Sequence, residues 1–337
     1  MVQLKKKLTV VVSNFNDEEF LNESLTAICK QTFQGMEIIF IDDASTDNSV
    51  EKARDILSCT PSHKVIVNKT NRGVIKNYND AINSIDSEYV YFASSNDCIV
   101  DGFFEKFIKI IDKDKSVALV SGLSMLMDEK GNLLGPSKSA VPSVKQLSLS
   151  KNEVLSVLIK KGNWIIGAST IYRLDLLKNI GGFREKLLGA TDSCAALCLG
   201  MRHGVIFDPT VVSVWRLSEN GFATSSLRKW STVASIVDEG IEYFSEKQIN
   251  NEFIKSWENE ILFWHFKSSV FERKQFSCFK NIAMRKGINS SFSIIFSVPF
   301  PMLFYVIFGL LIIAPKKIYQ RISIEIDWIK LRFLGKY

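Results

Sequence analysis

Two segments of this sequence run from an apolar stretch straight into acidic and amide side chains. Val90–Asp97 reads VYFASSND, and Glu37–Ser45 reads EIIFIDDAS. In an open parallel sheet, ligands bind at the carboxyl edge, where the strands end. Carboxylates gathered at such an edge suit a divalent metal ion, and a metal ion of this kind suits a diphosphate. The two segments therefore predict a metal-assisted diphosphate site at one edge of a sheet.

Strand-like and helix-like segments alternate through the first third of the chain. Leu8–Val12 is a short β-branched run, typical of a buried parallel strand, and Asp17–Gln31 has apolar residues at helical spacing. Further strands are expected at Glu37–Ile41, Lys64–Asn68, Tyr89–Ala93 and Val117–Ser121, and further helices at 45–57, Val74–Ile85 and Gly102–Asp112. This alternation predicts an α/β fold, with a doubly wound sheet flanked by helices.

The middle of the chain is less regular. Asp128–Val144 is polar and rich in Gly, Pro and Ser, which favours a loop or lid. Beyond it we expect a helix at Val144–Lys161, a strand at Trp164–Tyr172, a helix at Asp192–His203 and a short strand at Val205–Phe207. Residues 1–226 are therefore expected to form one α/β domain, and 227–337 a helical C-terminal region.

The C-terminal region carries two features that favour a membrane surface. Residues 294–314 are almost wholly apolar, close to the ~20 residues needed to span a bilayer. Pro299 and Pro301 interrupt this segment and basic residues flank it on both sides, so a re-entrant or in-plane segment fits better than a single crossing. A basic amphipathic helix follows, with an apolar stripe at Ile318, Ile322, Ile326, Ile329 and Phe333. A helix buried in the core is the alternative for this region.

Composition narrows the classes of protein. The net charge of +6 is mild and its basic residues concentrate near the C-terminus, which favours an anionic membrane surface over nucleic acid. The six cysteines form no C-x-x-C pair, so zinc and haem signatures are absent and buried free thiols are expected. The N-terminus lacks a signal-peptide core, which places this part in the cytoplasm. No G-x-G-x-x-G follows the first strand, which disfavours a redox dinucleotide enzyme.

Taken together, the segments resemble the family 2 glycosyltransferases with the GT-A fold, over about Leu8 to Arg216. The resemblance lies in VVSNFN (11–16), IDDASTD (41–47), NRG (71–73), SND (95–97), GGF (181–183) and the region of Asp192. Each piece is short, but their order and spacing together are specific. The resemblance implies that the expected doubly wound sheet is a mixed sheet like that of the GT-A fold.

The resemblance implies an inverting transfer of a sugar from a nucleotide-diphospho-sugar to a hydroxyl of a glycan or lipid-linked acceptor, at the cytoplasmic face of the cell membrane. By this resemblance Asp97 would bind Mg²⁺ or Mn²⁺, which compensates the charge of the leaving diphosphate. Asp192 would be the general base. The implied nucleotide-sugar contacts are Ser13, Asn14, Asp42, Asp43, Asn71, Arg72, Gly73, Lys76, Asn96 and Arg216.

The chain also departs from the family pattern. The metal motif reads Ser95-Asn96-Asp97 and holds one carboxylate, and Tyr78 stands where an arginine is usual, with Lys76 near enough to supply a charge. Each aspartate also suits a turn or a helix cap. A non-catalytic nucleotide-sugar-binding protein with the same fold therefore remains the alternative. A nucleotidyl-transferring enzyme is disfavoured because residues 8–16 hold no glycine.

Overall fold

The computed structural model describes residues 6–271 apart from Lys138, 219–220 and Leu227, and also 281–282, 285, 324–332 and 334–335. The side chains of 223–224 and 266–271 are not described. The apolar segment 294–314 lies outside these ranges, so its expected membrane contact stays a prediction. Within them, no helix combines the length and the apolar character that a bilayer crossing requires.

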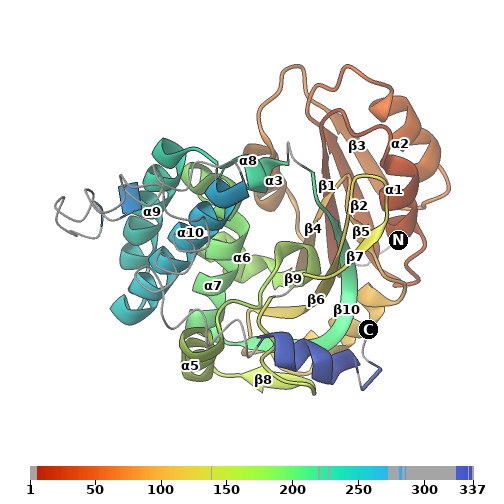
Figure 1. Ribbon diagram of the computed structural model, residues 1–337. Helices are drawn as coiled ribbons and strands as arrows, with labels where there is room; N and C mark the ends of the chain where they lie inside the picture. Colours follow the sequence, from red (N-terminus) through yellow and green to blue (C-terminus); the bar gives the residue numbers. More distant parts are fainter. Residues whose placement is uncertain are drawn as a thin grey trace.

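The described residues form a mixed sheet with the strand order β3-β2-β1-β4-β9-β6-β10-β5, with β7 beside β6 and β8 beside β10 (Figure 1). Its strands are β1 (Leu8–Asn14), β2 (Met36–Asp42), β3 (His63–Val67), β4 (Tyr89–Ser94), β5 (Cys98–Ile99), β6 (Leu119–Met127), β7 (Leu133–Pro136), β8 (Leu147–Leu149), β9 (Thr170–Arg173) and β10 (Val205–Arg216). The α/β fold is as predicted.

The direction of the strands decides where a site can form. β1 pairs in parallel with β2 and β4, and β6 pairs in parallel with β10. β9 lies between β4 and β6 and is antiparallel to both, so β4 and β6 point the same way. The carboxyl ends of β1, β2, β4, β6 and β10 therefore meet at one edge, where loops collect polar groups.

Helices cover both faces of the sheet (Figure 1). They are α1 (Leu21–Cys29), α2 (Ser49–Leu57), α3 (Val74–Ser84), α4 (Phe103–Ile111), α5 (Lys151–Lys161), α6 (Leu174–Asn179), α7 (Thr191–His203), α8 (Phe222–Ser226), α9 (Trp230–Glu246) and α10 (Asn251–Phe271), with 3₁₀ turns η1 (Gly167–Ser169) and η2 (Glu185–Ala190). α1, α2 and α4 pack on one face in one apolar cluster, and α3, α5, α6, α7, α9 and α10 belong to the cluster on the other face.

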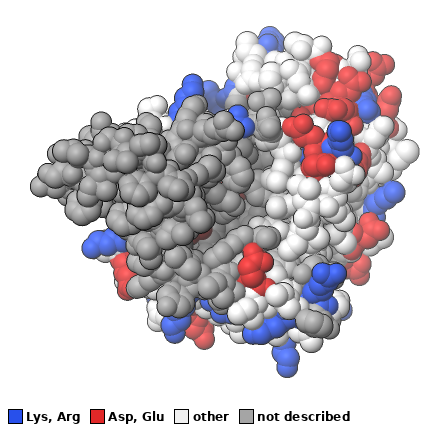
Figure 2. Space-filling model, in the orientation of Figure 1, with Lys and Arg blue, Asp and Glu red and all other residues white. Residues whose placement is uncertain are grey.

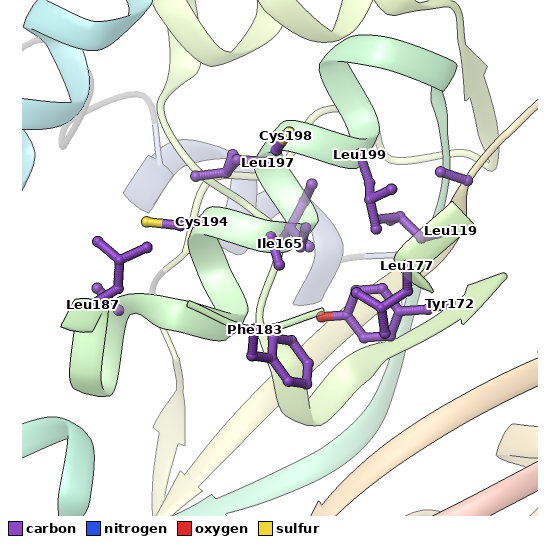
Figure 3. Close-up of a cluster of buried hydrophobic side chains, with 14 of the residues drawn as sticks. Leu119, Ile165, Tyr172, Leu177, Phe183, Leu187, Cys194, Leu197, Cys198 and Leu199 are labelled. Atoms are coloured by element: carbon purple, nitrogen blue, oxygen red, sulfur yellow. The ribbon is translucent and has the colours of Figure 1, made fainter. Parts of the chain in front are cut away.

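The strands feed both clusters because successive side chains point to opposite faces. Val10 and Val12 of β1 belong to the α1–α2–α4 cluster, whereas Val11 belongs to the other. Helix α7 is buried along most of its length, and Figure 3 shows Cys194 and Cys198 beside leucines of the same cluster. Both are free thiols, as predicted for buried cysteines, although Cys59 is exposed.

The middle of the chain departs most from the pattern. The helix predicted at Val144–Lys161 begins only at Lys151, because β8 precedes it and Ser150 forms a capping box with Glu153. The strand predicted at Trp164–Tyr172 is a 3₁₀ turn followed by the short antiparallel β9. The strand predicted at Val205–Phe207 continues to Arg216, because it keeps pairing with β6 across two register shifts.

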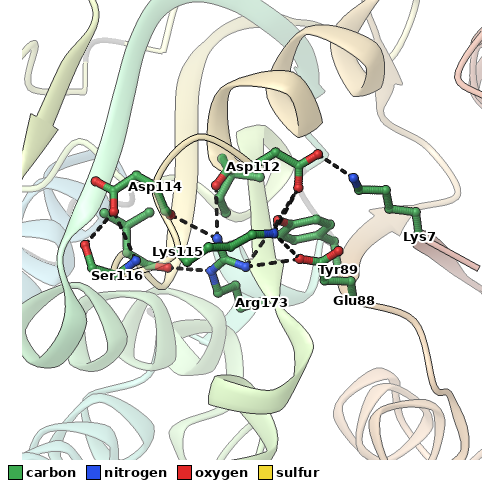
Figure 4. Close-up of polar contacts among 10 residues, drawn as sticks. Lys7, Glu88, Tyr89, Asp112, Asp114, Lys115, Ser116 and Arg173 are labelled. Carbon is green, nitrogen blue, oxygen red and sulfur yellow. Dashed lines mark hydrogen bonds and ion pairs between the residues drawn. The ribbon is translucent and has the colours of Figure 1, made fainter.

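Arg173 fixes the antiparallel strand β9 in place (Figure 4). The residue is 6 % exposed. Its guanidinium donates to the carbonyls of Val117 (2.8 Å), Ile111 (3.0 Å) and Asp114 (3.0 Å). It also donates to the hydroxyl of Tyr89 in β4, at 3.2 Å. One side chain therefore ties β9 to β4 and to the connection between α4 and β6.

The end of the chain packs against the α/β domain. Residues 324–332 are helical, and Trp328 and Leu331 are buried, with the Trp328 indole donating to the Ser139 carbonyl at 3.0 Å. Ile326 and Ile329 lie on the opposite side and are 46 % and 54 % exposed. The predicted apolar stripe is therefore split here: its two described members face outward, while residues that lie off the stripe dock the helix.

Charged side chains are mixed over the described part of the face shown in Figure 2, and acidic residues gather over the region of α1 and α2. Although the net charge is +6, the basic residues do not gather into one patch on the described part of this face. The prediction that nucleic acid is not a partner stays a prediction.

Candidate active site

The loops that follow β1 and β2 are held together by buried polar contacts. Asn14 donates from Nδ2 to Asp42 Oδ1 (2.8 Å) and to Ser45 Oγ (3.1 Å), and Asp42 Oδ2 accepts the Ser45 N–H at 2.9 Å. Both Asp42 oxygens thus have partners in the protein, and the residue is 0 % exposed. Asp42 therefore holds the loops after β1 and β2 together, and its contact with a nucleotide stays a prediction.

Asp43 organises the predicted nucleotide-sugar loop. Its Oδ1 accepts the Arg72 N–H at 2.9 Å, and its Oδ2 accepts the Gly73 N–H at 2.7 Å. Burial acts to raise the pKa of Asp43, but these hydrogen bonds and others from Asn68 and Asn77 outweigh it and lower the pKa. Asp43 is therefore an anion fixed under the loop, and it does not cap α2, whose N-cap is Asn48.

The remaining nucleotide-side predictions fall at the same edge. The carbonyls of Ser13 and Asn14 accept N–H groups of Ser95 and Asp43, which locks the end of β1 between its neighbours. Asn71 accepts the Gly73 N–H at 3.2 Å within its own loop. The guanidinium of Arg72 pairs with Asp80 at 2.7 Å, while Lys76 is exposed on α3. The structure thus brings these residues to one edge of the sheet, and their contacts with a nucleotide stay predictions.

Asp97 lies in the turn after β4. Its Oδ1 accepts the backbone N–H of Arg216 at 2.8 Å, so Oδ2 is the oxygen left for a ligand. Burial raises the pKa of Asp97 to about 7, against the effect of Arg216, and Asp17 adds to the rise. A carboxylate that burial makes costly to ionise would be stabilised by a cation.

A metal ion at Asp97 would take few ligands from the protein. In the described part of the chain, no three His, Cys, Asp or Glu side chains are grouped to hold a metal ion. Mg²⁺ commonly binds one or two carboxylates, waters and substrate phosphates. The single free oxygen of Asp97 fits a metal ion that arrives with a diphosphate. Asn96, next to it, accepts the Ser94 hydroxyl at 2.7 Å.

Arg216 was predicted to contact the diphosphate, but in the structure its guanidinium nitrogens bind groups of the protein itself. Its Nε donates to the Asn96 carbonyl at 2.9 Å, and its Nη1 donates to the carbonyls of Asp128 (3.2 Å) and Glu129 (3.1 Å). Its Nη2 pairs with Glu23, and the guanidinium carbon lies 4.7 Å from the centre of the Phe20 ring. The structure therefore makes Arg216 a positioning residue for the Asp97 turn, and contact with a diphosphate remains a prediction.

Asp192 is the second residue of α7, and its place depends on a glycine. Its Oδ1 accepts the Ser193 N–H at 2.7 Å. A Cβ at Gly167 in η1 would lie 2.2 Å from Asp192 Oδ2, so only glycine leaves room for the carboxylate. Burial raises the pKa of Asp192 above its usual value, against the two backbone hydrogen bonds. A raised pKa suits a carboxylate that takes up a proton.

Tyr78 lies within the electrostatic reach of both carboxylates, a placement that the sequence did not reveal. Its hydroxyl donates to the Ala93 carbonyl at 2.9 Å. Its pKa is raised by burial and then by the charges of Asp97 and Asp192, so both carboxylates lie near this ring. The phenol also packs against Phe92, with ring centres 4.8 Å apart. The one available signal was the aromatic residue where the family usually has an arginine.

The Gly-Gly-Phe turn supports the same wall. The side chain of Asn79 on α3 accepts the Phe183 N–H and donates to the Phe183 carbonyl, both at 2.8 Å. The Phe183 ring lies 4.9 Å from that of Phe92. A Cβ at Gly182 would lie 2.6 Å from Asn79 Oδ1, which explains why a small residue stands there. This turn leads through η2 into α7 and so positions Asp192.

Comparisons with known proteins agree with this arrangement. The family model described as Glycosyl transferase family 2 matches residues 9–160. An uncharacterized glycosyltransferase of Haemophilus influenzae is 25% identical over 171 residues, which cover 49% of this chain and 53% of that protein. The glycosyltransferase GlyA of Streptococcus pneumoniae is 30% identical over 115 residues, 34% of this chain and 16% of GlyA. These matches thus span about half of the first relative and far less of GlyA.

Solved structures show the same fold. TarS 1–349 of S. aureus superimposes with a TM-score of 0.59 at 19% identity, covering 82% of this chain and 81% of that one. The mannosyltransferase PcManGT of Pyrobaculum calidifontis gives a TM-score of 0.56 at 16% identity, over 99% and 88%. Residues 9–160 therefore form a domain that matches the Glycosyl transferase family 2 model.

Proposed function

We propose that the protein is an inverting glycosyltransferase that moves a sugar from a nucleotide-diphospho-sugar to a hydroxyl of a glycan or a lipid-linked acceptor. The observation that carries the proposal is the pair Asp97 and Asp192, two carboxylates with raised pKa whose charges both act on Tyr78. Groups of this kind often mark a functional site. The similar TarS was solved with UDP-GlcNAc and the similar PcManGT with GDP-Man and Mn²⁺, which supports a nucleotide-sugar donor.

In the proposed reaction, Asp192 accepts the proton of the acceptor hydroxyl as that oxygen bonds to the anomeric carbon. The bond from the anomeric carbon to the diphosphate breaks in the same displacement, and the nucleoside diphosphate leaves. Asp97 would hold Mg²⁺ or Mn²⁺, and the ion would compensate the charge of the leaving group. Arg216 holds the backbone of the Asp97 turn, and Asp43 holds the loop at 71–73 against the nucleotide.

A donor screen tests this proposal. The full chain is incubated with UDP-, GDP- and dTDP-sugars, with and without Mn²⁺, and release of the nucleoside diphosphate is measured. We expect one donor class to be consumed, faster with Mn²⁺. Binding of a donor without any turnover, with water or with mixed glycan acceptors, would favour the non-catalytic alternative. Absence of donor binding would contradict both.

We further propose that the protein acts at the cytoplasmic face of the cell membrane, held peripherally by its C-terminal region. The support from the described residues is apolar surface at the last helix and the turn after it, where Ile326, Ile329 and Leu334 are exposed. Lys330 and Arg332 lie on the same short segment and would face anionic lipid. The apolar segment 294–314 adds to this from the sequence.

A further inference from the structure

A cavity of about 380 Å³ lies at the C-terminal end of α7, away from the site around Asp97 and Asp192. It is formed by three separate parts of the chain: the start of α5, the end of α7 and the turn after α9. Its lining residues are Lys151, Met201, Arg202, His203, Glu246, Lys247 and Gln248. None of these residues has a part in the proposed reaction, so the cavity has no assigned role.

The lining carries an excess of positive charge. Lys151, Arg202 and Lys247 come from the three different segments. Within the described residues, none of the three pairs with a carboxylate. The acid in the lining, Glu246, is already held by Arg184, at 3.2 Å and 3.3 Å from its two guanidinium nitrogens. Three cations therefore line this space without an ion pair among the described residues, and the Lys247 ammonium lies 5.8 Å from the centre of the Tyr243 ring.

The fold makes these cations converge. Gly204, just after α7, has φ +91, and a Cβ there would lie 2.5 Å from the Leu149 carbonyl oxygen. The end of α7 is thereby held against the start of α5, where Lys151 is the first residue. Lys247 follows α9, and the turn is closed by the Ile249 N–H, which donates to the Phe244 carbonyl at 2.9 Å. The positive charge is thus built by tertiary contacts.

We propose that this cavity is a phosphate-binding site, separate from the donor site, formed by Lys151, Arg202 and Lys247. Lysine and arginine are the usual partners of phosphate, and arginine can bind it with two parallel hydrogen bonds. A volume of about 380 Å³ holds a phosphate together with part of the group that carries it. The ligand class is therefore a phosphate monoester or diester.

Helix α7 separates this cavity from Asp192. Arg202 follows Asp192 by ten residues on the same helix, and a rise of 1.5 Å per residue places them about 15 Å apart. Because α7 is buried along most of its length, a ligand in the cavity cannot extend beside the helix to Asp192, and a soluble phosphate compound is one source of this chemistry. The headgroup of an anionic lipid is the other source of the same chemistry.

His203 provides a local reporter of binding. The chain has three histidines, so their imidazole NMR signals can be assigned by substitution. Burial and then the charge of Arg202 lower the pKa of His203, whereas Asp175 on α6 acts to raise it. Lys151, Lys247 and Glu246 face it from α5 and from the end of α9. A bound phosphate adds negative charge, so we expect inorganic phosphate to raise the pKa of His203 by about one unit.

The titration compares inorganic phosphate with sodium chloride at equal ionic strength, because screening alone also weakens repulsion from cations. The exposed His63 on β3 is the internal control. The variant R202Q/K247Q should lose the shift. The matched variant K109Q/K113Q, on and just after α4 on the other face of the sheet, should keep it. No shift in the native protein, or an equal shift in R202Q/K247Q, would overturn the proposal.

A second measurement separates the two sources of phosphate. The native protein and the two variants are sedimented with phosphatidylglycerol vesicles and with phosphatidylcholine vesicles. If the cavity takes a lipid headgroup, R202Q/K247Q alone loses binding to the anionic vesicles. If it takes a soluble phosphate compound, vesicle binding stays equal while the response of His203 is lost. Both readouts are independent of sugar transfer, so a failure here is distinct from a failure of the proposed function.

Discussion

At the residue scale, the position of the Asp192 carboxylate depends on the absence of a side chain at Gly167. Gly167→Ala would place a methyl group 2.2 Å from Asp192 Oδ2, so the carboxylate must move. Because a displacement of about 1 Å can cost about 10²-fold in rate, we expect turnover to fall by that order while donor affinity stays the same. The measurement is transfer rate beside donor dissociation constant.

Gly200→Ala is the matched control for this substitution. It lies on α7, but its Cβ would meet a Val205 methyl at 2.7 Å in the core instead of a carboxylate. We expect Gly200→Ala to lower the melting temperature and to spare the rate per folded molecule. If Gly167→Ala turns over at the native rate, the glycine has no part in positioning Asp192.

The raised pKa of Asp97 predicts a pH dependence of stability in the metal-free protein. Between the ordinary value of 3.8 and about 7, the native state keeps a proton that the unfolded chain releases. Stability therefore falls as pH rises through this window, and the loss is complete above it. Asp97→Asn removes the penalty and keeps an oxygen for the Arg216 N–H. Its melting temperature should exceed that of the native protein above a pH of about 7, and the difference should shrink towards a pH of about 4.

Thermal unfolding at the two ends of this pH range checks the prediction, with the exposed Asp101→Asn as control. A gain that is the same at both pH values would mean that burial of Asp97 has no ionisation cost. Added Mn²⁺ should then stabilise the native protein more than Asp97→Asn, since the ion binds the charged form.

The sequence located the site residues better than it assigned their roles. The positions of Asp43, Asp97 and Asp192 at strand and helix ends follow from local pattern, because alternating strands and helices fix which ends meet. The hydrogen bonds that fill Asp42 and Arg216 come from residues far away in sequence, such as Asn14 for Asp42 and Glu23 for Arg216. No local pattern shows that a carboxylate or guanidinium is already occupied. Nor does a local pattern show that the charges of both Asp97 and Asp192 act on Tyr78.

At the element scale, the antiparallel strand β9 joins the two parallel parts of the sheet, and Arg173 holds it. Arg173→Met keeps a long side chain but leaves the carbonyls of Val117 and Asp114 without the guanidinium donor, whereas the Ile111 carbonyl still accepts the Asp114 N–H at 3.3 Å. Each buried group left unsatisfied costs about 1–3 kcal/mol, so we expect a loss of about 3–5 kcal/mol in the free energy of unfolding. Urea denaturation measures it.

Lys115→Gln serves as the comparison in the same network. Its ammonium pairs with Glu88 at 2.6 Å but is 62% exposed, so its loss should cost less than about 1 kcal/mol. Equal losses for the two variants would show that Arg173 acts as a surface charge and does not hold β9.

The elements that the sequence failed to predict are the ones built by pairing with distant strands. β8 forms because it pairs with residues 205–207 of β10. The last residues of β10 stay extended because they pair with residues 123–127 of β6. Trp164–Tyr172 is apolar enough for a strand, yet η1 forms because the chain must turn beneath Asp192. By contrast, α3 and α4 repeat apolar residues at helical spacing and were predicted to within one residue at each end.

At the scale of the whole molecule, the docked C-terminal helix changes how membrane association is tested. Removing everything after residue 286 would uncover the core contacts of Trp328 and Leu331. Substituting the exposed residues Ile326, Ile329 and Leu334 by serine leaves those contacts intact. We expect this triple variant to fold, to keep donor turnover and to bind anionic vesicles less than the native protein.

Vesicle sedimentation measures this, with the exposed pair L133S/L134S on β7 as the control for lost apolar surface elsewhere. Native protein that stays in the supernatant would contradict the membrane proposal itself. Unchanged binding of the triple variant would leave the apolar segment 294–314 as the anchor.

The central claim is that Asp192 takes the proton from the acceptor. Asp192→Asn keeps the shape of the side chain and an acceptor for the Ser193 N–H, but cannot take up the proton. Loss of a positioned base costs ~10²–10⁴-fold in rate. Asp208 is a poorer candidate for the base, because its Oδ1 accepts from Lys106 of α4, on the face of the sheet opposite α7.

The deciding measurement is the transfer rate of Asp192→Asn beside its donor dissociation constant, with the exposed Asp175→Asn as control. The account predicts a rate lower by about 10²-fold or more with unchanged donor affinity, the signature of an interaction used only in the transition state. Near-native turnover would contradict it, reduce Asp192 to a residue at the start of a helix and leave Glu185 as the next candidate for the base.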